Sequence, residues 1–194
     1  MADETSLSLI RRVQSNSRDG WNQLVSMYEP LVRRWLRRTG VDDDDVADIT
    51  QDVLATVVRE VGAFKHSGRP GAWRAWLRQI TVHRARRHFS RRKPANHGDS
   101  VHAFLAQMDD PNSELSNEWD QEHDRHVVTQ LLRAVDDEFQ PAARTVFWRT
   151  FIEGAAPADV AAELNMSLAA VYTAKSRVLA FLRREAEGIL ELAD

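Results

Sequence analysis

Ten Lys and Arg side chains lie between Val61 and Gly98, a stretch without Asp or Glu in a chain whose formal net charge is −3. Its first half places four apolar residues on one arc at 3.6 residues per turn: Trp73, Trp76, Leu77 and Ile80. The same arc continues into three arginines: Arg84, Arg87 and Arg91. A helix whose buried stripe turns basic is expected to leave its domain there and to contact an anionic partner, and nucleic acid is the leading candidate.

A solvated helix face is the alternative for this basic stretch. Arginine-rich faces are common on surfaces, and tryptophans at helical spacing usually belong to a core. Two features favour nucleic acid. A solvated face normally mixes both signs, whereas carboxylates are absent from this stretch and abundant on both sides of it. Aromatic side chains exposed among arginines also offer stacking surfaces to unpaired bases.

Length and composition limit the class of protein. The 194 residues, 43% of them hydrophobic, suffice for one domain or for two small ones. Because the chain has no cysteine, a disulfide framework, a thiolate metal site and a cysteine nucleophile are excluded. No run approaches the roughly 20 apolar residues of a membrane span, and the first eight residues do not form a signal peptide. We expect a cytoplasmic protein with no membrane partner.

Helical periodicity dominates the chain before the basic stretch. A short helix is expected around Leu7–Val13, and a longer one, capped by Asp19, from Trp21 towards Gly40. Pro30 lies inside the second pattern, where we expect a kink or a break, because proline removes a backbone donor and clashes with the preceding turn.

Four consecutive aspartates, 42–45, are expected to begin a third helix, since carboxylates suit the first turn. Asp48, Gln51 and Asp52 lie off its apolar stripe. A metal site on these aspartates is the alternative. The run lacks the glycine and glutamate of an EF-hand loop, and the chain has no second acidic cluster for a metal-pyrophosphate site, so we expect no metal and no cofactor.

The character of the chain reverses between Pro94 and Asp124. This segment has eight Asp and Glu residues, no Lys or Arg, and many Asn, Ser, Gly and Pro residues. It is predicted to be a linker, partly helical around Val101–Met108, which its acidity would keep from lying stably on a nucleic acid.

A second helical unit follows, with Pro141 in the first turn of one of its helices. The pattern that follows predicts a short helix over residues 157–164, a tight turn at 165–167 and a longer helix over 168–184. Asn165 suits a left-handed position and Ser167 suits an N-cap, which is typical of a helix-turn-helix. The outward positions of its second helix are Ala169, Ala170, Tyr172, Thr173, Lys175, Ser176 and Arg177. These suit major-groove and phosphate contacts, and a generic helical hairpin is the alternative.

Three motifs together resemble a bacterial sigma factor of the extracytoplasmic-function (ECF) type, in the sigma-70 class. The segment Asp48-Ile-Thr-Gln-Asp-Val-Leu resembles an acidic motif of the family that binds the coiled coil of the polymerase beta-prime subunit. The segment Ala72-Trp-Arg-Ala-Trp-Leu-Arg-Gln-Ile resembles the motif leading into the helix that melts and reads the minus-10 element. Residues 155–184 resemble the domain that reads the minus-35 element, and the segment from Ala170 to Leu179 is similar to a planctomycete-type variant.

The resemblance implies an all-α fold of two small helical domains. These are a sigma region 2 bundle over residues 1–95 and a sigma region 4 helix-turn-helix over 125–194, joined by the acidic linker 96–124. It also implies a non-enzymatic protein without catalytic residues. Its partners would be core RNA polymerase, through the beta-prime and beta subunits, promoter DNA and an anti-sigma factor.

Site residues follow from the same resemblance. Core polymerase would contact Asp48, Gln51 and Asp52. The minus-10 element would contact Trp73, His83, Arg84, Arg87 and Arg91, with Trp73 and the loop before it beside the displaced strand and Trp76 in the core. The minus-35 element would contact Tyr172, Thr173, Lys175, Ser176 and Arg177.

The chain departs from the family at positions that read bases. His83 stands where many members have Asn, Arg87 where they have Asp, and residues 172–174 where Lys-Ser-Arg is frequent, so the base preference cannot be carried over. Two other classes remain open: an autonomous helix-turn-helix regulator with an N-terminal sensing or dimerisation domain, and a helical enzyme using aspartates and a metal. The latter lacks a second acidic cluster, a phosphate loop and a nucleophile motif.

Overall fold

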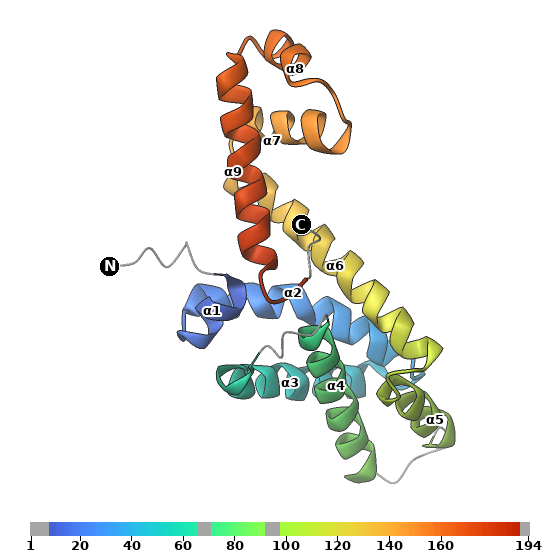
Figure 1. The fold of residues 1–194 in the computed structure, drawn as a ribbon. Helices are drawn as coiled ribbons and strands as arrows, with labels where there is room; N and C mark the ends of the chain where they lie inside the picture. The colour runs from blue at the N-terminus through green and yellow to red at the C-terminus, as the bar shows by residue number, and fades with distance from the viewer. Residues whose placement is uncertain (1–7, 66–70, 92–97, 191–194) are drawn as a thin grey trace.

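The computed structural model describes residues 8–65, 71–91 and 98–190, in which every regular element is a helix. The all-α prediction is therefore confirmed for this part of the chain. Figure 1 shows a lower bundle and an upper group of helices, joined by one long diagonal helix, α6. Within the described residues, no helix has the length and apolar character needed to cross a lipid bilayer.

The N-terminal unit begins with two helices, α1 (Leu9–Gln14) and α2 (Arg18–Arg37). Ser17, and not Asp19, caps α2: its hydroxyl accepts a hydrogen bond from the backbone N–H of Gly20, while Asp19 lies in the first turn. The helix continues through Pro30, so the expected break is absent. Leu31 and Val32, which follow the proline, are fully buried, and their packing offsets the missing backbone donor.

Two further helices, α3 (Asp43–Glu60) and α4 (Ala72–Arg91), complete this bundle below α2 (Figure 1). The carboxylate of Asp42 caps α3 by accepting from the backbone N–H of Asp45 at 2.8 Å, as the aspartate run predicted. A single 3-10 turn, η2 (Val61–Ala63), follows α3. The predicted end of the basic helix near Pro94 lies outside the described residues.

The segment expected to be a linker is helical beyond the part predicted around Val101–Met108. It forms α5 (Gly98–Asp109) and the first half of α6 (Glu114–Glu138), and α6 runs without a break across the predicted boundary at residues 124 and 125. Trp119 explains the difference, because its side chain is fully buried against Trp35 of α2, with ring centres 5.2 Å apart. Composition pointed to a solvated tether, but apolar residues at helical spacing attach the segment to the bundle.

The C-terminal unit consists of the second half of α6 and four shorter elements above it (Figure 1). These are α7 (Pro141–Phe147), the π-helical turn η3 (Trp148–Ile152), α8 (Pro157–Glu163) and α9 (Leu168–Ala186). Pro141 occupies the first turn of α7, as predicted. From the turn after α8, α9 runs back to the N-terminal unit, where Ala186 and the following Ile189 are buried in its core.

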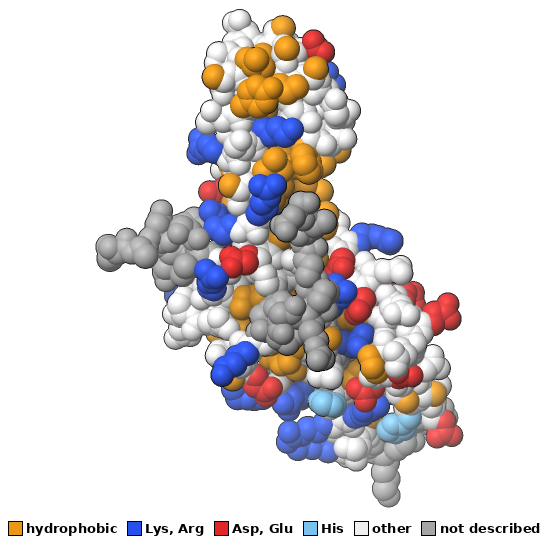
Figure 2. All heavy atoms as spheres, in the orientation of Figure 1, with side chains coloured by type: hydrophobic (Ala, Val, Ile, Leu, Met, Phe, Trp, Pro, Cys, Tyr) orange, Lys and Arg blue, Asp and Glu red, His pale blue; other side chains and the backbone are white. Residues whose placement is uncertain are grey.

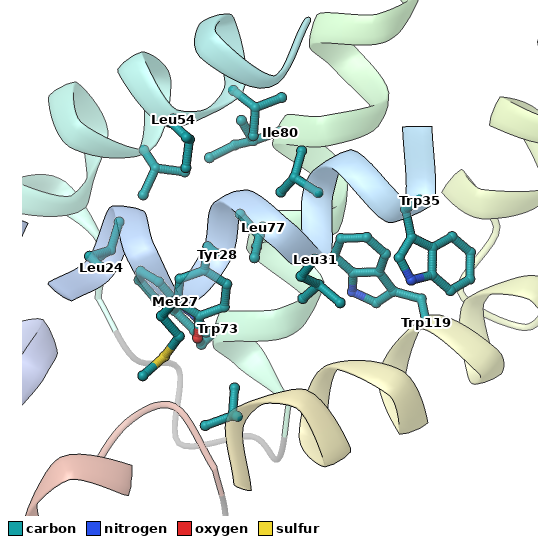
Figure 3. Close-up of a cluster of buried hydrophobic side chains, with 14 of the residues drawn as sticks. Leu24, Met27, Tyr28, Leu31, Trp35, Leu54, Trp73, Leu77, Ile80 and Trp119 are labelled. Carbon is teal, nitrogen blue, oxygen red and sulfur yellow. The ribbon is translucent and has the colours of Figure 1, made fainter. Parts of the chain in front are cut away.

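One hydrophobic core holds α1 to α6 together. Figure 3 shows its central part, where side chains of α2 meet those of α3, α4 and α6. Three tryptophans in it are at most 1% exposed: Trp35, Trp73 and Trp119. Burial of large aromatic side chains supplies much of the stabilisation of a small bundle, so this unit is the rigid platform of the molecule.

Candidate nucleic-acid interface

The second half of α4 presents a basic stripe to solvent. His83, Arg87 and Arg91 follow one another at spacings of four residues, so they share one helix face, and all three are exposed. Among the described residues none of the three has an ion-pair partner. Lys and Arg side chains gather at the lower end of the molecule in Figure 2, near the end of α4. We call His83, Arg87 and Arg91 the basic stripe.

Arg84 lies beside the basic stripe but is less accessible. Its side chain is 22% exposed, and Nη2 lies 3.7 Å from a carboxylate oxygen of Glu60 at the end of α3. A phosphate would have to compete with Glu60 for this guanidinium. Of the four basic residues predicted to contact the minus-10 element, three are therefore exposed without an ion-pair partner among the described residues, and the fourth, Arg84, is paired with Glu60.

Another face of the same helix is neutralised by the chain itself. Three of its arginines contact acidic residues of the segment that was expected to be a linker. The ion pairs are Arg74–Asp124 at 3.0 Å, Arg78–Asp120 at 3.2 Å and Arg86–Asp109 at 2.6 Å. The prediction of an external anionic partner concerned Arg84, Arg87 and Arg91, whereas this face of α4 meets carboxylates that α5 and α6 supply within the molecule. Among the described residues of α4, the basic stripe is therefore the part left for an external polyanion.

Trp73 corrects the sequence-based assignment. The side chain is 1% exposed, and its indole N–H donates a 2.7 Å hydrogen bond to the hydroxyl of Tyr28. It cannot stack on a base in this conformation. Trp76, which was expected in the core, is only half-buried. The centre of its ring lies 5.1 Å from that of Trp73 and 5.0 Å from that of Phe64. Helical periodicity placed both tryptophans on one arc and could not decide which one faces α2.

A buried polar network surrounds Trp73. The hydroxyl of Tyr28 also lies 3.4 Å from Nε2 of His123, and Nδ1 of His123 lies 2.9 Å from the Asp124 carboxylate. Burial raises the pKa of Tyr28 far above its ordinary value, so this phenol stays protonated. Burial acts to raise the pKa of Asp124, but the hydrogen bond from His123 and the charge of Arg74 outweigh it and lower that pKa. The network ties α2, α4 and α6 together.

The outer face of α3 carries an acidic ridge. Asp48, Gln51 and Asp52 are all exposed and lie on one side of the helix. Its opposite side is in the core, where Val46, Ile49 and Val53 are fully buried. The first-turn aspartates have structural tasks instead: Asp42 is the cap, and Asp45 lies 2.9 Å from Nε2 of His88.

Sequence reasoning missed two residues that extend the acidic ridge. Ala55 and Val58 are exposed one and two turns further along α3, and Val58 is 39% exposed. An exposed β-branched apolar side chain beside carboxylates suits contact with a protein better than contact with water. Their signal in the sequence was weak, because Val58 fits the apolar stripe of the helix equally well.

The turn between α8 and α9 has the local features that the sequence predicted. Asn165 has a φ of 52°, the left-handed conformation, and the hydroxyl of Ser167 accepts a hydrogen bond from the backbone N–H of Ala170 at 3.1 Å. Val160 and Val171 are fully buried between the two helices. The N-terminal turns of α9 lie at the end of the molecule far from α1 and α2 (Figure 1).

The predicted contact residues of α9 are not equally accessible. Tyr172 is 52% exposed, and Thr173, Ser176 and Arg177 are also exposed. Lys175 is half-buried, and its ammonium group lies 5.9 Å from the ring centre of Phe151. In Figure 2, hydrophobic side chains gather over this upper part of the molecule. The exposed large ones there are Phe151, Ile152, Leu168 and Tyr172.

Comparisons with known proteins agree with this geometry in the N-terminal unit. Residues 24–94 match the family model of sigma-70 region 2. The ECF RNA polymerase sigma-E factor of Haemophilus influenzae is 28% identical over an alignment of 126 residues, and the match covers 59% of this chain and 65% of that relative. The match thus spans slightly less than two thirds of the relative. The family-model match confirms the prediction of a sigma-70 region 2.

A solved structure of CnrH in complex with the cytosolic domain of CnrY is also similar, with 22% identity. The alignment covers 90% of this chain and 92% of that one, with a TM-score of 0.37. At this TM-score the likeness supports no conclusion about how the helices are arranged.

Proposed function

We propose that this chain, which carries a sigma-70 region 2 over residues 24–94, is an ECF-type sigma factor that binds core RNA polymerase and directs transcription initiation. Sigma factors are not enzymes, and none of the roles proposed below is catalytic. One observation carries the proposal: the region 2 match includes helix α4, which carries the basic stripe. Among the described residues of α4, the basic side chains without an ion-pair partner are those of this stripe. The planctomycete-type variant and a cytoplasmic location belong to the same proposal.

The acidic ridge of Asp48, Gln51 and Asp52 is proposed to contact the beta-prime subunit. Carboxylates and an amide on an exposed helix face suit a basic, hydrogen-bonding partner surface. The fully buried stripe on the opposite side of α3 holds the ridge in place, so binding requires no reordering of the helix. Val58 would add apolar contact at the end of the ridge.

The basic stripe is proposed to hold the phosphates of the minus-10 element. Arg87 and Arg91 would contact the backbone of the opened strand, with His83 beside them, and Arg84 would join after leaving Glu60. Extruding a base from the duplex costs a few kcal/mol, which phosphate contacts and polymerase binding would offset. Because Trp73 is buried, the half-buried Trp76 is the aromatic side chain better placed to approach an unpaired base.

The C-terminal unit is proposed to act as sigma region 4. Its helix α9 would enter the major groove of the minus-35 element with Tyr172, Thr173 and Ser176, while Lys175 and Arg177 contact phosphates. Contact with the beta subunit and control by an anti-sigma factor are parts of this proposal.

The experiment that tests the proposal mixes the full chain with sigma-free bacterial core polymerase. We expect comigration on size exclusion and run-off transcription from genomic fragments. The absence of both, together with tight duplex binding by the chain alone, would favour an autonomous regulator.

A charge reversal on the acidic ridge sharpens this test. Asp52→Arg should weaken binding to core polymerase by at least tenfold, because it places a positive charge against a basic partner. Asp137→Arg makes the same change at an exposed position of α6 and should leave binding unchanged. Equal binding by both variants, with unchanged circular dichroism, would refute the assignment of the ridge.

A further inference from the structure

The face that α9 offers to DNA has an unusual composition. Within residues 168–176 the exposed positions are Leu168, Ala169, Tyr172, Thr173 and Ser176. None of them is Arg, Lys, Asn or Gln. The nearest exposed cation of the helix is Arg177, and Lys175 is half-buried beside the Phe151 ring.

This composition restricts which bases the face can read. In the major groove, guanine is distinguished by bidentate Arg or Lys and adenine by bidentate Asn or Gln, and the face has none of these in its first two turns. Thymine alone among the DNA bases presents a methyl group there, which apolar side chains and the methyl group of Thr contact. Leu168 and Tyr172, at 44% and 52% exposed, are free to make such contacts.

The hydroxyl of Thr173 supports the same reading. It donates a 2.9 Å hydrogen bond to the backbone carbonyl of Ala169, one turn earlier in α9. Its hydrogen is thus used within the helix, and no donor remains for a base acceptor. What Thr173 can offer to the groove is its methyl group and an oxygen lone pair.

The packing of α9 fixes which face is outward. Val171 and Val178 are fully buried, and Phe181 continues that stripe into the core of the C-terminal unit. Because these residues anchor one side of the helix, Tyr172, Thr173 and Ser176 remain on the opposite side. Lys175 lies at the edge of the outward face, where its ammonium group is 5.9 Å from the ring centre of Phe151 and away from the first turn of α9.

We propose that α9 recognises its duplex element mainly through thymine C5-methyl groups, contacted by Leu168, Tyr172 and Thr173. This inference rests on the proposed function, which places α9 in the major groove. The flanking Arg177 contacts phosphate and adds affinity without base selectivity. The recognised element is accordingly thymine-rich on the strand that faces the first two turns of α9.

The test uses the holoenzyme of the full chain with core polymerase. A promoter selected from a library with a randomised upstream element is remade with 2′-deoxyuridine at each thymine in turn, which removes only the methyl group. At each contacted thymine we expect a three- to fivefold loss of affinity, about the effect of burying one methyl group. The loss should be absent at thymines outside the upstream element.

Matched variants assign the contact. Thr173→Ser keeps the hydroxyl that bonds Ala169 but removes the methyl group, so one position should lose its preference for thymine over deoxyuridine. Thr173→Val keeps a methyl group and should retain that preference. Circular dichroism and thermal melting of both variants show whether α9 is intact.

Deoxyuridine without effect at every upstream thymine would overturn the inference, as would a selected element in which 7-deazaguanine costs tenfold. Either result, obtained with a holoenzyme that initiates, leaves the proposed function standing. Failure to bind core polymerase refutes the proposed function instead. The same selection and deoxyuridine series, run with the chain alone, then decides the thymine inference.

Discussion

The two units of the molecule differ in how they are held together. In the N-terminal unit, one core extends over α1 to α6 and contains three buried tryptophans. In the C-terminal unit, the buried residues form two clusters of four, one around Phe147 and Phe181 and the other around Val160 and Val171. A larger continuous core resists local opening better, so the N-terminal unit is the platform and the C-terminal unit is the more easily opened part.

The units also differ in the use of charge. In the N-terminal unit, acidic residues of α5 and α6 cover one face of the basic helix α4. In the C-terminal unit, no ion pair with an acidic side chain covers the exposed face of α9 from Leu168 to Arg177 in the part of the chain that the structure describes. One unit thus limits its polyanion contact to a narrow stripe, while the other leaves its recognition face open.

The largest expected effect comes from removing the side chain that attaches α6 to the platform. Trp119→Ala should lower the free energy of unfolding by about 3–5 kcal/mol, because a fully buried indole is lost together with its hydrogen bond to the carbonyl of Arg74. Denaturant titration followed by circular dichroism measures this loss.

Trp148→Ala is the matched control for that substitution. Trp148 is half-buried beside the small cluster around Phe147, so its loss should cost clearly less. If Trp119→Ala costs less than Trp148→Ala, the first half of α6 is a tether after all, and the contrast between the two units is wrong.

A second substitution breaks the contact between the units. Glu185 of α9 accepts a 2.8 Å hydrogen bond from Arg12 of α1, and the side chains are 3% and 9% exposed. Glu185→Ala leaves the guanidinium buried without this partner and should cost about 3 kcal/mol. We expect α9 to leave α1, which small-angle scattering would record as a larger radius of gyration.

Glu187→Ala provides the comparison for Glu185. It removes an ion pair with Arg11 of similar length, 2.7 Å, but the two side chains are 50% and 60% exposed. Its effect should be at most about 1 kcal/mol. Equal losses for the two variants would show that burial does not decide the strength of this contact.

The smallest expected effect is a dependence on pH at the α2–α6 contact. Burial lowers the pKa of His126, whose Nε2 hydrogen-bonds the backbone carbonyl of Met27. As the pH falls, the unfolded chain binds a proton at His126 before the folded chain does, because the pKa of this imidazole is lower in the folded state. The contact of neutral His126 therefore stabilises the fold fully above pH 6.5, the ordinary pKa of histidine, and this stabilisation is lost as the pH falls below 6.5. His126→Gln keeps a donor without titrating, so the stability of the variant should fall less between pH 7.5 and 5.5. Identical slopes for both proteins would exclude His126 as the source.

Much of the fold followed from local patterns. Caps and turns depend on a few neighbouring residues, so several of them were predicted correctly. These are the helix starts at Asp42 and Ser167, the left-handed conformation of Asn165 and the place of Pro141 in the first turn of α7. The open basic side chains of α4 and the outward residues of α9 were also identified, since helical spacing separates faces.

Apart from the cap of α2, which is Ser17 and not Asp19, the misplaced features involve contacts between distant residues. The segment 96–124 was expected to be a linker because it is acidic and polar, but Trp119 and the ion pairs with α4 attach it to the bundle. Trp73 was expected at the DNA because the resemblance to sigma factors implied that role, and its hydrogen bond to Tyr28 of α2 holds it in the core. Neither partner is close in the sequence.

The sequence by itself determined the helices, their faces and the separation of basic and acidic stretches, because these depend on periodicity and capping within a few residues. Only the tertiary structure decided which cations of α4 are free. That choice depends on where α5 and α6 place their carboxylates, which is set by the burial of Trp119 against Trp35. Local patterns define which side chains share a face, but the packing between helices decides whether that face meets solvent or another part of the chain.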